Sequence, residues 1–170
     1  MLHRIPILLM CLLLAGCATS TPPNQQPLDA EPPAINSVDV VKVLPQETTI
    51  ARGESGEVLV VVQVANGYHI NANPPSQSYL KATELEFESA GGVAVNFISY
   101  PDPVVRKFSF SEAPLKVYEG ETSLKVQLRV DKNASTGQHN LSGKLRVQAC
   151  DDKVCYAPGA IDLTLPLSIK

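Results

Sequence analysis

The segment I-D-L-T-L-P-L-S-I-K at residues 161–170 alternates apolar and polar side chains at every position. A period of two residues is typical of a β-strand that packs one face on a core and turns the other to water. Pro166 lies inside this run and has no N–H to donate to a neighbouring strand, which predicts that the strand lies at a sheet edge. The alternation also defines the pattern to look for in the rest of the chain.

The same alternation recurs over most of the chain after residue 35. Lys125–Val130 and Lys144–Ala149 alternate in the same way, whereas Val58–Val64 is almost continuously apolar and is expected to be a more central strand. Further strands are expected at Val38–Leu44, Tyr68–Asn71, Thr83–Glu88, Val93–Ser99 and Leu115–Tyr118. Residues typical of turns separate these segments, and no helical period persists, although Ser76–Ala82 has room for a single turn. Eight or nine short strands at this spacing predict an all-β domain, an immunoglobulin-like β-sandwich, at residues 36–170.

The overall composition is that of a folded domain with a mildly acidic surface. The 170 residues include 14 basic and 17 acidic side chains and are 44% hydrophobic, which argues against wholesale disorder. The formal charge of −3 argues against a nucleic-acid partner, because binding to phosphates requires a basic surface.

The first residues of the chain have the layout of an export signal. Arg4 precedes the apolar run Ile5–Leu14, which is too short for a membrane-spanning helix and is typical of a secretory signal. The run ends in L-A-G-C at residues 14–17, which resembles the lipobox of bacterial lipoproteins and implies cleavage before Cys17 and diacylation of its thiol. Two acyl chains hold a protein firmly on a bilayer without spanning it. The alternative is an ordinary signal peptide with an incidental cysteine.

A spacer is expected to follow the lipidated cysteine. Residues 18–35 contain five prolines and few large apolar side chains, which is typical of a semi-extended flexible linker; an ordered arm is the alternative. In the lipoprotein sorting rule, Ala18 in place of aspartate favours the outer membrane over the inner. We therefore predict a signal peptide at 1–16, a lipidated Cys17 with a linker to residue 35, and a globular domain that faces the periplasm.

Cys150 and Cys155 are the candidate chemistry of the globular domain. Cys11 falls in the signal and Cys17 is the expected lipid site, so these two thiols remain in an exported compartment that permits disulfides. The four residues between them fit a tight connection between two strands. A bridge over so short a loop adds only about 2 kcal/mol in the loop-entropy model, so the spacing leaves a structural bridge and a redox pair both open.

Metal binding and hydrolysis have less support. Two thiolates need further ligands for a tetrahedral metal site, and His69 and His139 stand in no metal-binding spacing with the cysteines. A lone histidine on a strand is ordinarily a surface group or a satisfied core group. No Ser-His-Asp arrangement or nucleophile elbow is visible, which argues against a hydrolase. We therefore expect neither a metal nor another cofactor.

Four segments carry a resemblance to a known family. They are G-Y-H-I-N at 67–71, Y-P-D-P at 100–103, V-Y-E-G at 117–120 and, most specifically, Q-A-C-D-D-K-V-C-Y-A-P at 148–158. Together they resemble the N-terminal periplasmic domain of the thiol-disulfide interchange protein DsbD, over roughly residues 40–169 and in the same order. That resemblance implies an immunoglobulin-like domain that takes electrons from a thioredoxin-like domain and passes them to oxidised envelope proteins.

The resemblance also implies roles for the two cysteines. Cys155 matches the cysteine that forms the mixed disulfide with partners, and Cys150 matches the resolving thiol. The gap between them is slightly shorter here than in the family. Since the sequence ends at Lys170 without an electron conduit or a thioredoxin-like domain, the electrons of this stand-alone lipoprotein are expected to come from a separate protein.

Aromatic residues near the pair are matched in the same way. Tyr156 matches the aromatic residue beside the second cysteine, and Tyr68 matches one on a strand near the site. The cap loop of the family corresponds to Tyr100–Phe110, where the match is poor, so Phe108 and Phe110 are both candidates to shield the pair. The domain would then be a possible protein-disulfide reductase component. The alternative function is a non-catalytic envelope lipoprotein with a small structural disulfide, acting as a binding or adaptor module.

Overall fold

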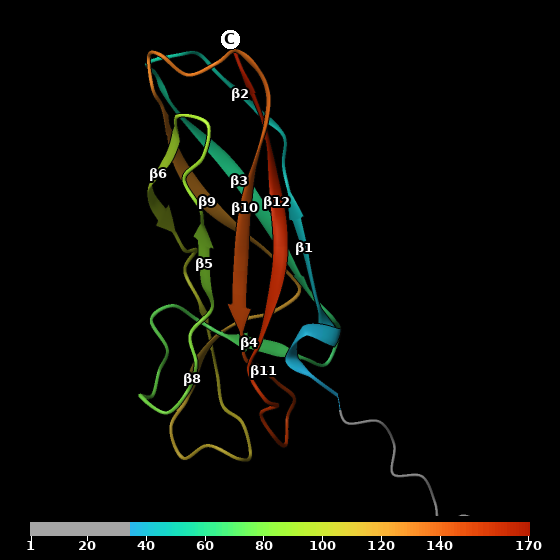
Figure 1. Ribbon diagram of the computed structural model, residues 1–170. Coiled ribbons are helices and arrows are strands. Elements are labelled where there is room, and N and C mark those ends of the chain that lie inside the picture. The colour runs from blue at the N-terminus through green and yellow to red at the C-terminus, as the bar shows by residue number, and fades with distance from the viewer. Residues whose placement is uncertain (1–34) are drawn as a thin grey trace, which may run out of the picture. The chain divides into compact units, whose positions relative to one another are not determined.

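The structure of the protein is a computed structural model that describes residues 35–170. The predicted signal peptide, the lipidated Cys17 and all but the last residue of the predicted linker lie outside the described residues. Over the described part the chain is almost entirely β (Figure 1). Its elements, in chain order, are the 3₁₀-helix η1 Ser37–Val40 and the strands β1 Val41–Pro45, β2 Thr48–Ile50, β3 Ser55–Val64, β4 His69–Asn71, β5 Glu84–Phe87, β6 Val93–Ser99, β7 Val104–Arg106, β8 Leu115–Tyr118, β9 Glu121–Val130, β10 Gly137–Val147, β11 Ala149–Cys150 and β12 Gly159–Ile169.

Two four-stranded sheets form the body of the domain. The first sheet has the order β1-β3-β9-β6 and the second the order β2-β12-β10-β5, with all pairs antiparallel except β2 and β12. Val60 and Val126 of the first sheet and Leu145 and Leu165 of the second are fully buried in one shared core. Two sheets that pack face to face around one apolar core form a sandwich, which confirms the predicted all-β, immunoglobulin-like fold.

Strand β12 shows how the alternation of the sequence becomes packing. Leu163, Leu165 and Leu167 are buried, while the residues between them are exposed or half-buried. Removing a leucine side chain from water contributes about 1.5–3 kcal/mol, so this face fixes the register of the strand. The prediction of an edge strand is wrong, because β12 lies between β10 and β2. However, β2 pairs only with Leu167–Ile169, so the part of β12 with Pro166 has only β10 as a hydrogen-bonded neighbour.

Other differences from the predicted strands have local causes. The segment expected to begin a strand at Val38 starts as η1, where Asn36 N–H donates to the Asp39 carboxylate at 2.8 Å and Asp39 N–H donates back to the Asn36 carbonyl at 3.0 Å. Strands β2 (T-T-I) and β7 (V-V-R) were not predicted, because neither alternates apolar and polar residues. Val58–Val64 lies in β3, a central strand, as expected. In the segment expected to hold a single turn, Leu80 N–H donates to the Gln77 carbonyl.

A third sheet closes one end of the sandwich. Its order is β11-β4-β8-β7, and Figure 1 shows it below the long strands of the body. Strand β11 follows β10 after one residue, so the chain passes directly from the second sheet into the third. No helix within residues 35–170 has both the length and the apolar character that crossing a membrane requires.

Candidate functional site: a disulfide hairpin at the end of the sandwich

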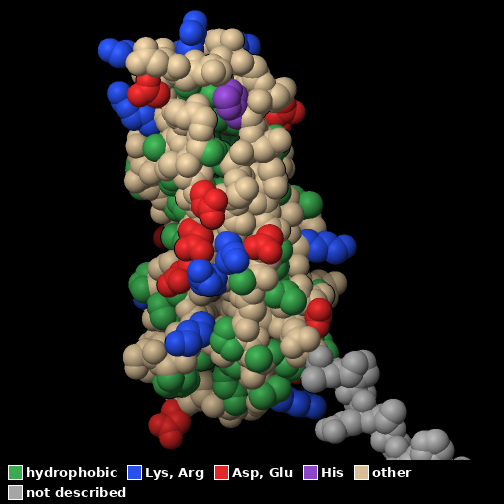
Figure 2. Space-filling view, in the orientation of Figure 1, with side chains coloured by type: hydrophobic (Ala, Val, Ile, Leu, Met, Phe, Trp, Pro, Cys, Tyr) green, Lys and Arg blue, Asp and Glu red, His purple; other side chains and the backbone are tan. Residues whose placement is uncertain are grey.

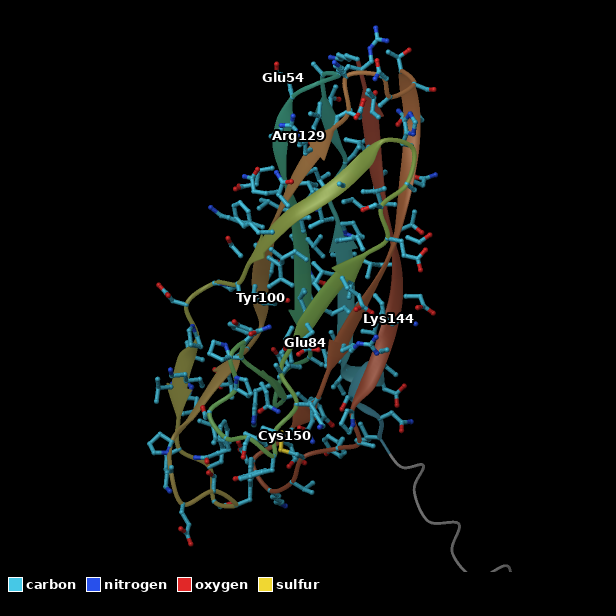
Figure 3. All side chains as sticks on the ribbon, turned by 60° about the vertical axis from the view of Figure 1, so that its left-hand side comes forward. Glu54, Glu84, Tyr100, Arg129, Lys144 and Cys150 are labelled. Atoms are coloured by element: carbon cyan, nitrogen blue, oxygen red, sulfur yellow. A yellow bond between two sulfur atoms is a disulfide. The ribbon has the colours of Figure 1, made fainter. Side chains whose placement is uncertain are left out.

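Cys150 and Cys155 face each other across a tight hairpin and form a disulfide bond. Their sulfurs are 2.00 Å apart and their Cα atoms 3.9 Å apart. Two backbone hydrogen bonds flank the pair: Asp151 N–H donates to the Val154 carbonyl at 2.9 Å, and Tyr156 N–H donates to the Ala149 carbonyl at 2.8 Å. The cysteines therefore occupy a non-hydrogen-bonded position of an antiparallel pair, where side chains come closest together. The predicted proximity of the two sulfurs is confirmed, and Figure 3 shows Cys150 at this end of the molecule.

The Asp151 carboxylate organises the turn between the cysteines. One oxygen accepts the Lys153 N–H at 2.7 Å and the Val154 N–H at 2.8 Å, and the other accepts the Tyr156 hydroxyl at 2.7 Å. The Tyr156 hydrogen bond, followed by the Lys153 N–H, holds the pKa of Asp151 below its usual value. The same hydrogen bond raises the pKa of Tyr156 to about 12. At neutral pH the turn therefore holds a carboxylate and a neutral phenol.

Buried polar groups tie both arms of the hairpin to the body. The Ser37 hydroxyl, fully buried, accepts the Ala149 N–H at 2.9 Å and donates to the Ala157 carbonyl at 2.6 Å. Gln148 Nε2 donates to the Tyr156 carbonyl at 3.3 Å. Because these contacts hold the arms without involving sulfur, they do not require the disulfide to be closed.

The two cysteines differ in exposure. Cys150 lies on β11 and is fully buried, whereas Cys155 is half-buried. Cys155 packs against a small apolar cluster, separate from the main core, that consists of Leu80, Phe108, Leu115 and Val117. A molecule that approaches this end from solvent therefore meets Cys155 first.

His69, which the sequence predicted to be a surface group or a satisfied core group, lies directly opposite Cys150. His69 on β4 pairs with Cys150 in the ladder between β4 and β11. It is 3% exposed, and its ring stacks on Phe108 with the centroids 4.0 Å apart. Its Nε2 is buried and has no hydrogen-bond partner among the described residues. Only the pairing of β4 with β11 reveals this arrangement, because the two residues are far apart in sequence.

Both candidate shielding phenylalanines lie in the loop between β7 and β8. Phe108 is buried, whereas Phe110 is half-buried, and their ring centroids are 5.5 Å apart. The Ser109 hydroxyl donates to the Asp152 carbonyl at 2.7 Å, which joins this loop to the tip of the disulfide hairpin. The loop therefore covers the face of the third sheet that carries His69.

The two candidate tyrosines pack against each other on another side of the hairpin. The ring centroids of Tyr68 and Tyr156 are 6.0 Å apart, and both residues pack against the main core. Tyr68 immediately precedes His69, and successive side chains of an extended segment point to opposite sides. The structure therefore places every predicted site residue of the globular domain around the hairpin. Among residues 35–170, no three His, Cys, Asp or Glu side chains gather into a metal-binding group.

A comparison with known protein families finds one match, which spans most of the globular domain. Residues 40–166 match the family described as "Thiol:disulfide interchange protein DsbD, N-terminal". The chain belongs to this family. The resemblance drawn from the sequence is thereby confirmed.

Several solved structures are similar to the chain at low sequence identity. The N-terminal periplasmic domain of ScsB from Proteus mirabilis is 18% identical with a TM-score of 0.49, and the match covers 75% of this chain and 45% of that one. This chain thus spans less than half of the ScsB chain. The seventh ScaB type I cohesin from Pseudobacteroides cellulosolvens is 9% identical with a TM-score of 0.46, over 76% and 92% of the two chains. CaCohA2 from Clostridium acetobutylicum is 10% identical with a TM-score of 0.44, over 77% and 91%. No curated protein matches the chain.

Proposed function

We propose that Cys150 and Cys155 form a reversible redox pair through which this domain passes electrons from a thioredoxin-like donor to oxidised envelope proteins. The observation that carries the proposal is the unequal exposure of the two bonded sulfur-bearing residues. Cys155 is half-buried at the end of the fold, whereas Cys150 is fully buried behind it. This asymmetry favours Cys155 as the partner-bonded cysteine and Cys150 as the resolving one.

The exchange proceeds through two mixed disulfides. A thiolate of the donor attacks Cys155, the bond to Cys150 breaks, and its electron pair stays on Cys150, which takes up a proton. A second donor thiol, as the thiolate, attacks the donor sulfur and releases Cys155 as a thiolate, so the donor leaves oxidised. Cys155 then attacks a disulfide of the client protein, and Cys150 resolves that mixed disulfide and restores the starting bond. Each cycle moves two electrons from donor to client.

The hairpin is built to keep its shape when the disulfide opens. Ser37 and Gln148 hold its arms, and the Asp151 carboxylate holds its turn. None of these hydrogen bonds involves a sulfur atom. The reduced and oxidised domains are therefore expected to share one fold, which a shuttle needs and a structural bridge does not.

Exposed apolar side chains on the hairpin, on the third sheet and in a nearby loop favour a protein as the partner. Val154 lies in the hairpin and is 50% exposed, and Val105 lies on β7 and is 62% exposed. Tyr79, which precedes Leu80 of the small apolar cluster, is 70% exposed. Figure 2 shows hydrophobic side chains gathered at this end of the domain. Such a patch is characteristic of a protein-binding surface.

Trapping a mixed disulfide tests this function. A Cys150→Ser domain retains Cys155 and is expected to form a dithiothreitol-sensitive covalent complex with an oxidised thioredoxin-like protein. The matched Cys155→Ser domain retains only the buried Cys150 and is expected to form much less complex. Equal trapping by both variants would contradict the assigned roles. Trapping by neither would favour the static-disulfide adaptor.

Phe108 is the proposed shield of the pair, with Phe110 as its outer neighbour. In the reduced domain, Phe108→Ala is expected to increase the rate at which iodoacetamide alkylates Cys155, because the ring that covers this face is removed. The matched control is Phe97→Ala, which truncates an exposed ring on β6 in the body. Mass spectrometry of the alkylated peptide gives the rate. An unchanged rate in Phe108→Ala would show that the loop does not shield the site.

We also propose that Cys17 is lipidated and that it anchors the domain on the periplasmic side of the outer membrane. The L-A-G-C sequence at residues 14–17 and the residue Ala18 support this. Cells fed labelled palmitate are expected to label the protein, whereas cells that carry Cys17→Ser are not. Membrane fractionation then gives the location, and a label in the inner-membrane fraction would contradict the sorting.

A further inference from the structure

We infer that His69 accepts the proton of the Cys150 thiol when that thiol resolves a mixed disulfide. The inference rests on the proposed exchange function and assigns a proton acceptor to it. The family match and the sequence motifs identify the cysteines, but they leave open where the proton of the buried thiol goes.

The first observation is an unsatisfied buried nitrogen. His69 is 3% exposed, and its Nε2 has no hydrogen-bond partner among the described residues. Buried polar atoms are nearly always paired, so an unpaired one needs an explanation. In the oxidised domain neither cysteine carries a proton. Reduction creates an S–H donor at Cys150, which we expect to be the partner that Nε2 lacks in the oxidised state.

The second observation is that His69 lies directly opposite Cys150 in the sheet. Cys150 is the Cα partner of His69 across the β4–β11 ladder. Residues directly opposite each other in an antiparallel pair point to the same face, with their Cβ atoms about 4.5–5.5 Å apart. Phe108 covers the imidazole ring, and Cys155 packs against the cluster that contains Phe108. The imidazole and both sulfur-bearing residues therefore share one covered face.

The charges around the ring keep it a proton acceptor. Burial lowers the pKa of His69, whereas the carboxylates of Glu119, Asp152 and Asp151 raise it. Glu119 follows β8, and the two aspartates belong to the disulfide hairpin, so negative charges face the ring from both neighbouring elements. Burial is the larger effect, so the free ring is neutral at neutral pH. The carboxylates stabilise the imidazolium that forms once the ring has taken a proton.

The resolving step balances without another reactant. Nε2 of the neutral imidazole takes the proton from Cys150 Sγ, and the resulting thiolate attacks Cys155 Sγ. The Cys150–Cys155 bond forms while the bond between Cys155 and the client sulfur breaks, and its electron pair leaves on the client. The client thiolate then takes up the proton from the imidazolium, which returns His69 to its neutral form.

The test uses a small leaving group, so that it does not depend on any protein partner. Reaction of the reduced domain with Ellman's reagent releases one coloured thionitrobenzoate and forms a mixed disulfide at Cys155. Cys150 then releases a second thionitrobenzoate in an intramolecular step, which is the step that is timed. His69→Phe is expected to slow this release by about a hundredfold, the low end of what a positioned proton acceptor contributes. As the pH is lowered, the wild-type rate of this release is expected to fall where His69 takes up a proton, at a pH below the ordinary histidine pKa of 6.5. This inflection is expected to be absent in His69→Phe.

Two further variants serve as a replacement for His69→Phe and as a matched control. His69→Gln keeps a polar side chain that does not titrate, and it replaces His69→Phe if that variant fails to fold. His139→Gln is the matched control, because His139 lies on β10 with its ring nitrogen 2.7 Å from the Ser135 carbonyl. It is expected to behave as wild type. A His69 variant with the wild-type rate and pH profile would overturn the inference.

A second readout separates this inference from the proposed function. In a Cys155→Ser background, the pKa of the Cys150 thiol follows from its alkylation rate against pH. A neutral Nε2 that accepts from the S–H group stabilises the protonated thiol, so removing the imidazole is expected to lower that pKa. An unchanged pKa would contradict the inference. A wild-type domain that releases thionitrobenzoate but never exchanges with a thioredoxin-like protein would refute the proposed function and leave the role of His69 intact.

Discussion

The body of the sandwich and its disulfide end are held together by different forces. In the body, the buried side chains of the two large sheets are apolar. The buried polar residues of the described chain lie at the disulfide end or in segments that are hydrogen-bonded to it. They are Ser37, His69, Asn71, Thr83 and Ser111. The hydrophobic effect that stabilises the body is non-directional, whereas the hydrogen bonds of the end each require one particular partner.

This difference separates stability from function within one domain. The body tolerates changes that preserve apolar volume, because its stability depends on buried area and packing. At the disulfide end, Asn71 shows the opposite case, since its amide joins β4 to the Lys81 carbonyl and to the Gln148 side chain, both at 3.1 Å. We expect substitutions in the body to change global unfolding, and substitutions at the end to change the behaviour of the cysteines.

The largest effect on stability is expected from Leu165→Ala in the body. Leu165 is fully buried on β12, so its truncation leaves a cavity and is expected to lower the free energy of unfolding by about 2–5 kcal/mol. Urea denaturation measures the loss, and Thr164→Ala on the exposed face is the control. The rate of thiol-disulfide exchange by the folded protein is expected to stay unchanged. A parallel loss of exchange in folded Leu165→Ala would show that the two regions are not separable.

An intermediate effect is expected from Ser37→Ala. The variant leaves the buried Ala149 N–H without its acceptor and removes the hydrogen bond to the Ala157 carbonyl. Leaving such a group unpaired costs about 1–3 kcal/mol. Relative to wild type, amide hydrogen exchange in Ser37→Ala is expected to speed up more at the hairpin than in β3 of the body. Uniformly faster exchange across the domain would contradict a local role, and Ser142→Ala on the surface of β10 is the control.

The smallest effect is expected from Asp151→Asn, and it depends on pH. The pKa of Asp151 is lowered in the folded protein, so its carboxylate stabilises the fold at pH above its ordinary value of 3.8. This contribution is lost as the pH falls through the folded-state pKa. The unfolding free energy of Asp151→Asn is therefore expected to depend less steeply on acid pH than that of wild type. Asp152→Asn is the control, and identical pH curves for wild type and Asp151→Asn would contradict the account.

The strands of the body were predictable because each one shows its pattern within its own stretch of sequence. A buried strand face repeats every second residue, so the alternation of residues 161–170 predicts β12 without knowledge of its neighbours. The short strand β7 was missed because its three residues are all exposed and show no period. The edge position predicted for β12 was wrong because β2, its parallel neighbour, is too short to show a strand pattern.

The disulfide end was predictable only in part, because its contacts join distant residues. The cysteine pair and its neighbouring tyrosines follow from a short motif and a family resemblance. The hydrogen bond from Ala149 N–H to the Ser37 hydroxyl joins residues that are 112 positions apart. A single serine or histidine carries no periodic signal, so neither Ser37 nor His69 was assigned its place from the sequence. Only the folded register brings them to the hairpin.

The reduction potential of the Cys150–Cys155 pair tests the central claim most directly. The oxidised domain is equilibrated with a thioredoxin-like protein of known potential, and the two redox forms of each protein are counted by mass spectrometry after alkylation. Exchange proteins have potentials between about −270 and −120 mV, whereas structural disulfides lie below about −300 mV. The account predicts a value in the first range, with the fold unchanged on reduction. A value in the second range would make the pair a static bridge and would contradict the account.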